Sequence, residues 1–335
     1  MPRKIAQDIL NHQDITPLKA LTLNEAALDT LCGCANEIRE EFMGNAFDLC
    51  TIINAKSGAC SEDCAYCAQS SRHPVDSVET YPLLDVTRIT REAKYNAQSG
   101  VHRFSMVTSG KRLSKQDLNG ICHTAAHIRD HVDIKLCTSN GLLSRNDFER
   151  LKQNGVTRYH NNLESSAAYF PKICTTHTYE EKIAAIRAAQ NAGLSVCSGG
   201  IMGMGETMED RIALAFTLKK LGITSVPVNI LSPIPGTPLA DMPVLSNDEV
   251  CRIIAIFRYI LPNAYIRLAG GRGQLPDQGR KAFMSGANAV ITGDMLTTSG
   301  ISIAKDIDMI TTLGFNVSPI VPEMHCQTSL KNGNT

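Results

Sequence analysis

The chain has 335 residues, 43% of them hydrophobic, with 33 Lys and Arg against 33 Asp and Glu. Zero net charge excludes the strong positive field that draws proteins to nucleic acid or anionic membranes, and the apolar runs are too short to span a bilayer. Twelve cysteines and an N-terminus without a signal-peptide core indicate a cytoplasmic protein whose thiols serve metal or redox chemistry.

Along the chain, residues 1–45 are expected to form a short helical extension, and β-rich segments then alternate with helical patterns. Six helical patterns end at a glycine, which most easily adopts the left-handed conformation after a helix: Gly100, Gly155, Gly193, Gly222, Gly286 and Gly314. We expect residues 319–335 to form a partly disordered tail. The eight candidate strands are 48–54, 102–108, 134–139, 158–163, 195–201, 226–231, 265–270 and 289–294.

Strand–helix alternation predicts parallel strands with right-handed crossovers. Eight such units within residues 46–318 predict an α/β fold, a (β/α)8 barrel of the TIM type. An open doubly wound sheet is the alternative, but no G-x-G-x-x-G follows the first strand. Chemistry in a barrel lies at the carboxyl ends of the strands, on inward-pointing residues. The polar or sulfur residues in these strands predict a sulfur-rich pocket: Ser105, Cys137, His160, Asn162, Cys197, Asn229 and Arg267.

The segment SGACSEDCAYCAQSS follows the first strand and spaces Cys60, Cys64 and Cys67 as C-x3-C-x2-C. A structural zinc site normally has four ligands, and His73 is the candidate for a fourth. Three thiolates would instead leave one iron of a four-iron cluster open to a cofactor. The spacing, with Tyr66 before the third cysteine, resembles that of radical S-adenosylmethionine (AdoMet) enzymes. The resemblance implies a 4Fe-4S cluster and AdoMet, cleaved to a radical that removes hydrogen from unactivated carbon.

Five motifs in order, KSGACSEDCAYCAQSS, YHNNLESS, VCSGGIMGMGET, PVNILSPIPGTPL and IRLAGGR, resemble those of the biotin synthase family. The resemblance covers about residues 45–318. It implies a sulfurtransferase that inserts sulfur into dethiobiotin to give biotin, with an auxiliary iron–sulfur cluster as sulfur donor. It also implies a homodimer and an electron donor such as flavodoxin or ferredoxin. Neither nucleic acid nor a membrane is an expected partner.

The resemblance assigns Cys137, Cys197 and Arg267 to the auxiliary cluster as ligands and catalytic residues. Ser105 stands where the family has the remaining cysteine, and a serine oxygen binds iron less well than a thiolate does. We therefore hypothesise that Cys174, in the loop after the fourth strand, joins Cys137 and Cys197 around a rearranged cluster, 2Fe-2S or larger. The alternatives are a buried loop cysteine without a second cluster, and an Arg267 that binds a carboxylate.

The resemblance also assigns residues to the two small molecules. Tyr66, Glu164, Lys182, Gly199 and Gly200 are expected at AdoMet, with turn formation as the alternative role of the glycines. His160, Asn162, Asn229, Thr297 and Thr298 are expected at the substrate, where Asn can both donate to and accept from a ureido ring. A barrel histidine satisfied by its neighbours is the alternative for His160.

Two other functions remain open at this point. One is a related radical AdoMet barrel enzyme that transfers no sulfur, of the hydrogenase maturase or methylornithine synthase type. The missing strand-two cysteine favours it, whereas the Asn pair and the CSGG motif oppose it. The other is a zinc-binding barrel protein without enzymatic activity, which metal analysis would distinguish.

Overall fold

The computed structural model describes residues 1–73, 75–297 and 300–317. The predicted tail at 319–335 lies outside these residues. The helices are α1 (Pro2–Leu10), α2 (Pro17–Thr22), α3 (Leu28–Met43), α4 (Val86–Gln98), α5 (Lys115–His131), α6 (Arg145–Gln153), α7 (Tyr179–Asn191), α8 (Met208–Lys220), α9 (Asn247–Ile260), α10 (Arg280–Phe283) and α11 (Ile303–Thr312). The strands are β1 (Asp48–Lys56), β2 (Arg103–Thr108), β3 (Lys135–Ser139), β4 (Val156–His160), β5 (Ser195–Cys197), β6 (Gly200–Met202), β7 (Ser225–Ile230), β8 (Tyr265–Leu268) and β9 (Ala289–Ile291).

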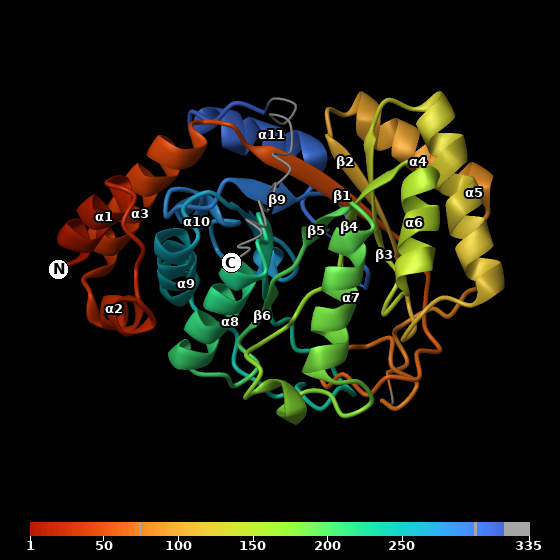
Figure 1. The fold of residues 1–335 in the computed structure, drawn as a ribbon, viewed down its shortest axis with the longest axis horizontal. Coiled ribbons are helices and arrows are strands. Elements are labelled where there is room, and N and C mark those ends of the chain that lie inside the picture. The colour runs from red at the N-terminus through yellow and green to blue at the C-terminus, as the bar shows by residue number, and fades with distance from the viewer. Residues whose placement is uncertain (74, 298–299, 318–335) are drawn as a thin grey trace, which may run out of the picture.

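The strands form one parallel sheet in the order β5-β4-β3-β2-β1-β9-β8-β7-β6, which a pairing of β5 with β7 closes into a barrel. The helices lie outside the ring (Figure 1). The predicted α/β barrel of the TIM type is therefore confirmed. The predicted fifth strand, 195–201, is wrong as a single strand, because the chain leaves the ladder at residues 198 and 199 and forms β5 and β6.

The sequence signals at helix ends agree with the structure. The six glycines predicted to follow helices all have positive φ, between 68° and 111°. Helices α6, α7, α8 and α9 each begin with a capping box, in which a Ser or Thr and an acidic residue three positions later bond to each other's backbone N–H groups. These signals fix where each crossover turns back toward the barrel.

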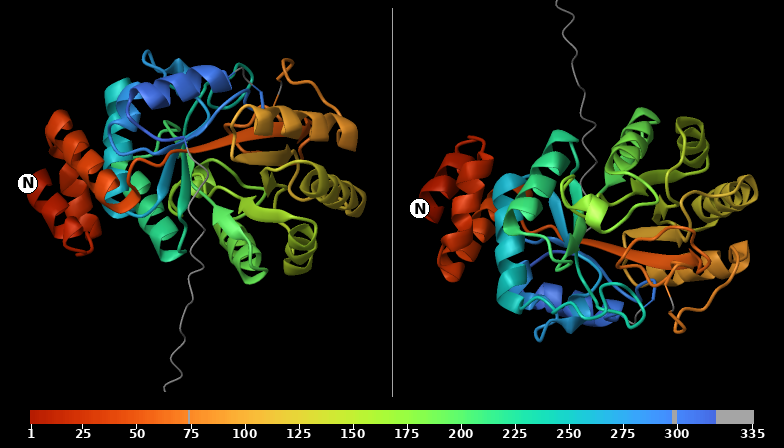
Figure 2. Two further views of the ribbon diagram at one scale, coloured as in Figure 1. Left: turned by 90° about the horizontal axis from the view of Figure 1, so that it is seen from above. Right: turned by 90° about the horizontal axis from the view of Figure 1, so that it is seen from below.

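Helices α1, α2 and α3 form a group at one end of the molecule, beside the barrel (Figure 2). They pack mainly on α9 and α8. Helix α9 is therefore covered on both sides, which explains why Val250, Cys251 and residues 253–260 are all buried and why its sequence is apolar around most of its circumference. No helix in the described ranges is long and apolar enough to cross a membrane.

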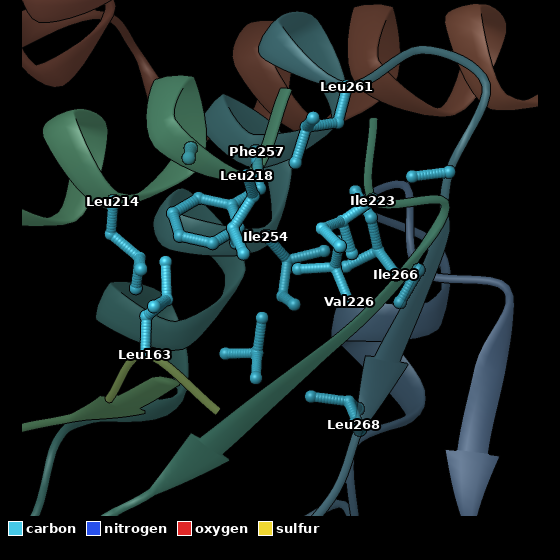
Figure 3. Close-up of a cluster of buried hydrophobic side chains, with 14 of the residues drawn as sticks. Leu163, Leu214, Leu218, Ile223, Val226, Ile254, Phe257, Leu261, Ile266 and Leu268 are labelled. Atoms are coloured by element: carbon cyan, nitrogen blue, oxygen red, sulfur yellow. The ribbon is translucent and has the colours of Figure 1, made fainter. Parts of the chain in front are cut away.

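A hydrophobic cluster joins α8 and α9 to the strands beneath them (Figure 3). Burying each aliphatic or aromatic side chain of this kind contributes about 1.5–3 kcal/mol. The cluster holds β7 and β8 in place, and these strands carry Asn229 and Arg267. Its labelled members are Leu163, Leu214, Leu218, Ile223, Val226, Ile254, Phe257, Leu261, Ile266 and Leu268.

Candidate functional site

A cavity of about 330 Å³ reaches from the loop after β1 into the barrel. Its size is that of a pocket for a small molecule. Aliphatic side chains make up much of its wall: Ile52, Val107, Ile201, Ile230, Leu231, Ile234, Ile291 and Leu296. The sulfur and polar groups that share the wall include Cys50, Cys67, Arg103, Ser105, Cys137, Arg158, His160, Asn162, Glu164, Cys197, Asn229 and Arg267.

The C-x3-C-x2-C loop folds around one edge of this cavity. The backbone N–H of Cys67 donates to the carbonyl of Cys64 at 2.9 Å, and the N–H of Cys60 donates to the carbonyl of Gln69 at 3.1 Å. Tyr66 and Cys67 line the cavity, and burial raises the pKa of the Tyr66 phenol. The loop therefore brings a cysteine-rich turn to the cavity wall.

Glu164 lies beside this turn with a strained backbone, at φ 70°. It lines the cavity, and its buried Oε2 has no hydrogen-bond partner among the described residues. A buried carboxylate oxygen of this kind accepts readily from ligand hydroxyl groups. Lys182, also expected at AdoMet, does not line the cavity; its buried Nζ donates to the carbonyl of Asn162 at 3.0 Å. The cavity edge at Glu164 thus fits a ligand that carries hydroxyl groups.

Gly199 and Gly200 do not line the cavity. A Cβ on Gly199 would lie 1.8 Å from the carbonyl oxygen of Pro227, and one on Gly200 would lie 2.4 Å from that of Glu164. Glycine is needed at both positions because two segments of backbone pass close together. Contact between these glycines and AdoMet stays a prediction.

The predicted substrate amides both line the cavity and are held by backbone groups. The Oδ1 of Asn162 accepts from the N–H of Gly199 at 3.0 Å. The Nδ2 of Asn229 donates to the carbonyl of Gly200, and its Oδ1 accepts from the N–H of Gly270, both at 3.0 Å. Each amide is therefore fixed in orientation. Thr297 also lines the cavity, whereas Thr298 lies outside the described residues.

Arg267 lies deep in the barrel and pairs with Asp48 of β1. Its Nη1 also donates to the carbonyl of Val290 at 2.9 Å. Burial acts to raise the pKa of Asp48, but the neighbouring Arg267, His102 and Arg158 outweigh burial and hold that pKa well below the usual carboxyl range. In this structure Arg267 therefore binds a carboxylate of the chain itself, that of Asp48.

Cys137 and Cys197 line the same end of the cavity as Arg267. Burial raises the pKa of Cys137, and Ser105 hydrogen-bonds to it. Burial also acts to raise the pKa of Cys197, but its hydrogen bond to His160 and the charge of His160 outweigh burial and lower the pKa to about 6. His160, expected at the substrate, therefore contacts a cysteine.

Sequence reasoning missed Cys50, which lines this end of the cavity from β1. It is close enough to Cys137 and Arg267 for their charges to affect its pKa, which burial raises to about 12. Cys50 pairs in register with Arg103 on β2, and Ile52 pairs with Ser105. The inward alternation that singled out Ser105 would have found Cys50 if applied to the first strand.

Cys174 does not join Cys137 and Cys197. Its Sγ lies 3.8 Å from the Sγ of Cys64, and it does not line the cavity. The loop after β4 passes over the C-x3-C-x2-C loop, where the N–H of Ala65 donates to the carbonyl of Ile173 at 2.8 Å. This crossing, which places Cys174 beside the first cysteine group, is not visible in the sequence.

Comparison with known proteins is consistent with this geometry. Two family models match: the Radical SAM superfamily at residues 55–218 and the Biotin and Thiamin Synthesis associated domain at residues 227–316. The chain is 54% identical over 297 residues to a biotin synthase of Akkermansia muciniphila, covering 89% of this chain and 92% of that protein. It is 52% identical over 314 residues to one of Clostridium botulinum, covering 94% and 98%. A solved methylornithine synthase has a TM-score of 0.79 at 19% identity, covering 93% of this chain and 96% of that one.

Proposed function

The chain belongs to the biotin synthase family of radical AdoMet enzymes, and from that premise we propose that it inserts sulfur into dethiobiotin inside the barrel. The observation that carries this proposal is the cavity itself. One end meets the C-x3-C-x2-C turn through Tyr66 and Cys67, and its wall also carries Cys50, Cys137 and Cys197. A substrate between the two groups would face a radical source and a sulfur source at once.

At the first group, Cys60, Cys64 and Cys67 would hold the 4Fe-4S cluster. With AdoMet bound, this cluster supplies the radical that removes hydrogen from carbon. Glu164 would accept from the ribose hydroxyls with its unpartnered Oε2, and Lys182 would attract the AdoMet carboxylate. The aliphatic wall excludes water from the reacting carbons.

At the second group, we assign the auxiliary cluster to Cys50, Cys137 and Cys197. Among the described residues, only Cys64, Cys174 and His177 bring three metal-binding atoms within 4.8 Å of one another. The Sγ atoms of Cys50, Cys137 and Cys197 are therefore not all within 4.8 Å of one another, which does not suit a single metal ion. The third thiol would come from β1 instead of from Ser105, which hydrogen-bonds to Cys137.

Charge also supports a cluster at this position. The carboxylate of Asp48 faces three buried guanidinium groups, those of Arg103, Arg158 and Arg267. Guanidinium groups this close to the cysteines favour thiolates, as the effect of Arg267 and Arg158 on the pKa of Cys197 indicates, and they favour an anionic cluster. In this arrangement Arg267 would stabilise the cluster electrostatically while Asp48 holds its guanidinium. Direct ligation by Arg267 would require it to release contacts with Asp48 or Val290.

The substrate would lie between the two groups, with its ureido ring near Asn162 and Asn229 and its alkyl chain along the aliphatic wall. Thr297 would contact it from the loop after β9. Flavodoxin or ferredoxin as electron donor, and a homodimeric state, follow from the family alone. Reduction assays with each donor and analytical ultracentrifugation would test these two expectations.

The alternative, a radical enzyme that transfers no sulfur, has weaker support. The likeness to methylornithine synthase is at 19% identity and concerns the fold, whereas identity to biotin synthases exceeds 50% over most of the chain.

The function is tested by supplying the anaerobically reconstituted enzyme with dethiobiotin, AdoMet and reductant, and measuring biotin and 5′-deoxyadenosine. We expect Cys137→Ala and Cys197→Ala to abolish biotin formation while retaining AdoMet cleavage. Cys122→Ala, a change at a buried cysteine of α5 away from the cavity, is the matched control and should retain both products. Biotin formation that survives both cavity substitutions would refute the sulfur-donor assignment.

A further inference from the structure

Cys174 has no role in the chemistry assigned above, yet it lies in an ordered group of metal-binding side chains. We propose that Cys64, Cys174 and His177 form a site for one thiophilic divalent cation, such as Zn²⁺, in the chain before its radical cluster is assembled. The inference rests on the proposed function in one respect only, the assignment of Cys64 to that cluster.

The distances fit a tetrahedral ion. With Zn–S bonds of about 2.3 Å, two thiolates on one tetrahedral ion lie about 3.8 Å apart. The Sγ atoms of Cys64 and Cys174 are 3.8 Å apart. With a Zn–N bond of about 2.0–2.1 Å, a thiolate and an imidazole nitrogen lie about 3.5 Å apart, and the Nδ1 and Nε2 of His177 are 3.2 and 3.7 Å from the Sγ of Cys174.

The orientation of His177 also fits. Its Nδ1 lies 2.7 Å from the Oε2 of Glu62, and both side chains are buried. Because most metal-binding histidines donate one ring nitrogen to a carboxylate and bind the metal with the other, we assign Nε2 as the ligand atom. Three protein ligands would then leave a fourth position open.

Two loops are clamped together around these ligands. The Oδ1 of Asp63 accepts from the backbone N–H groups of Thr175 and Thr176, at 2.9 and 3.2 Å. This carboxylate therefore fixes the backbone next to Cys174 against the loop that carries Cys64. A site that spans two loops but is already held in place loses little conformational entropy when it binds.

The acidic side chains around Cys64, Cys174 and His177 favour binding of a cation. Glu62 and Asp63 lie beside Cys64 and Cys174, so four groups that are or become anionic meet here. Lys182 acts on Cys64 electrostatically from nearby. Two thiolates and an imidazole select zinc and similar metals over magnesium or calcium.

Because Cys64 belongs to both sites, the single ion and the complete radical cluster exclude each other. Zn²⁺ bound here would block assembly of the cluster at Cys60, Cys64 and Cys67, and its release would free the thiol of Cys64. The group therefore couples cluster assembly to metal occupancy.

Anaerobically prepared apoprotein can be titrated with Co²⁺, whose absorption reports tetrahedral geometry and thiolate ligands. We expect one tight site per chain, with Zn²⁺ displacing Co²⁺. Cys174→Ser and His177→Gln should each weaken binding at least about tenfold, whereas Cys122→Ser, a change at a buried cysteine of α5 away from the cavity, should leave the titration unchanged. Circular dichroism checks folding of every variant. Unchanged titrations in Cys174→Ser and His177→Gln would overturn the proposal, as would loss of the tight site in Cys60→Ser or Cys67→Ser.

A second measurement tests the competition. Preloading with one Zn²⁺ per chain should slow reconstitution of the radical cluster from iron and sulfide in the wild type and have little effect in Cys174→Ser. Equal inhibition in both would refute the shared-ligand account. Neither experiment measures biotin. A negative result here would therefore leave the proposed function untouched, and a failure to form biotin would leave the result of the metal titration unchanged.

Discussion

Replacing Asp48 with Asn would remove the carboxylate that pairs with the buried guanidinium of Arg267. Asp48 is 1% exposed and Arg267 is 2% exposed. Removing one partner of a buried ion pair typically costs about 3–5 kcal/mol, because the other charge stays buried without compensation. We expect Asp48→Asn to lower the free energy of unfolding of the apoprotein by about that amount at pH 7.

Urea unfolding of the apoprotein, followed by circular dichroism, measures this change. The folded-state pKa of Asp48 is depressed, so its stabilisation is present above the ordinary carboxyl pKa and is lost only as the pH falls below it through the folded-state value. The gap between wild type and variant should therefore persist from pH 7 to about pH 5.

Asp130→Asn, at an exposed pair with Arg129 on α5, is the matched control and should leave the urea midpoint essentially unchanged. The anionic auxiliary cluster should partly offset the lost carboxylate, so the cost of Asp48→Asn should be smaller after reconstitution. A change below about 1 kcal/mol in the apoprotein would refute the electrostatic account of this end of the barrel.

Three further outcomes follow from the geometry. Gly199→Ala should destabilise the chain by about 1–3 kcal/mol in urea, because its Cβ would meet the carbonyl of Pro227 at 1.8 Å; a loss below about 1 kcal/mol would contradict the close approach. In the apoprotein, site-resolved alkylation of Cys197 should rise with a midpoint near pH 6, and His160→Asn should move it toward the ordinary thiol range; an unmoved midpoint would remove His160 from the site. Lys182→Met should weaken AdoMet binding at least about tenfold in equilibrium dialysis, and unchanged binding would exclude Lys182 from the AdoMet site.

The barrel could be predicted because its signals are local. Strand–helix alternation and the glycines after helices depend on a few consecutive residues, and the same is true of the C-x3-C-x2-C spacing. The division of the fifth predicted strand was not predictable in this way. It arises where Gly199 passes the backbone of β7, a contact between segments far apart in sequence.

The cysteines also show that contacts between distant segments cannot be read from local sequence signals. Cys137 and Cys197 were found because they alternate inward on recognisable strands, and Cys50 meets the same criterion on β1. Cys174 was assigned to the wrong group because a loop position at the top of a barrel does not say which neighbouring loop it touches. That contact is set by Asp63, which binds the backbone of residues 175 and 176.

The central claim is that one cavity joins a radical cluster to a second cluster held by Cys50, Cys137 and Cys197. Iron and acid-labile sulfide per chain, with Mössbauer spectra, on reconstituted wild type and Cys50→Ala test it most directly. We predict a four-iron cluster in both proteins, and a second cluster in the wild type that is lost or altered in Cys50→Ala. A second cluster identical in both, or only four irons in the wild type, would contradict the account.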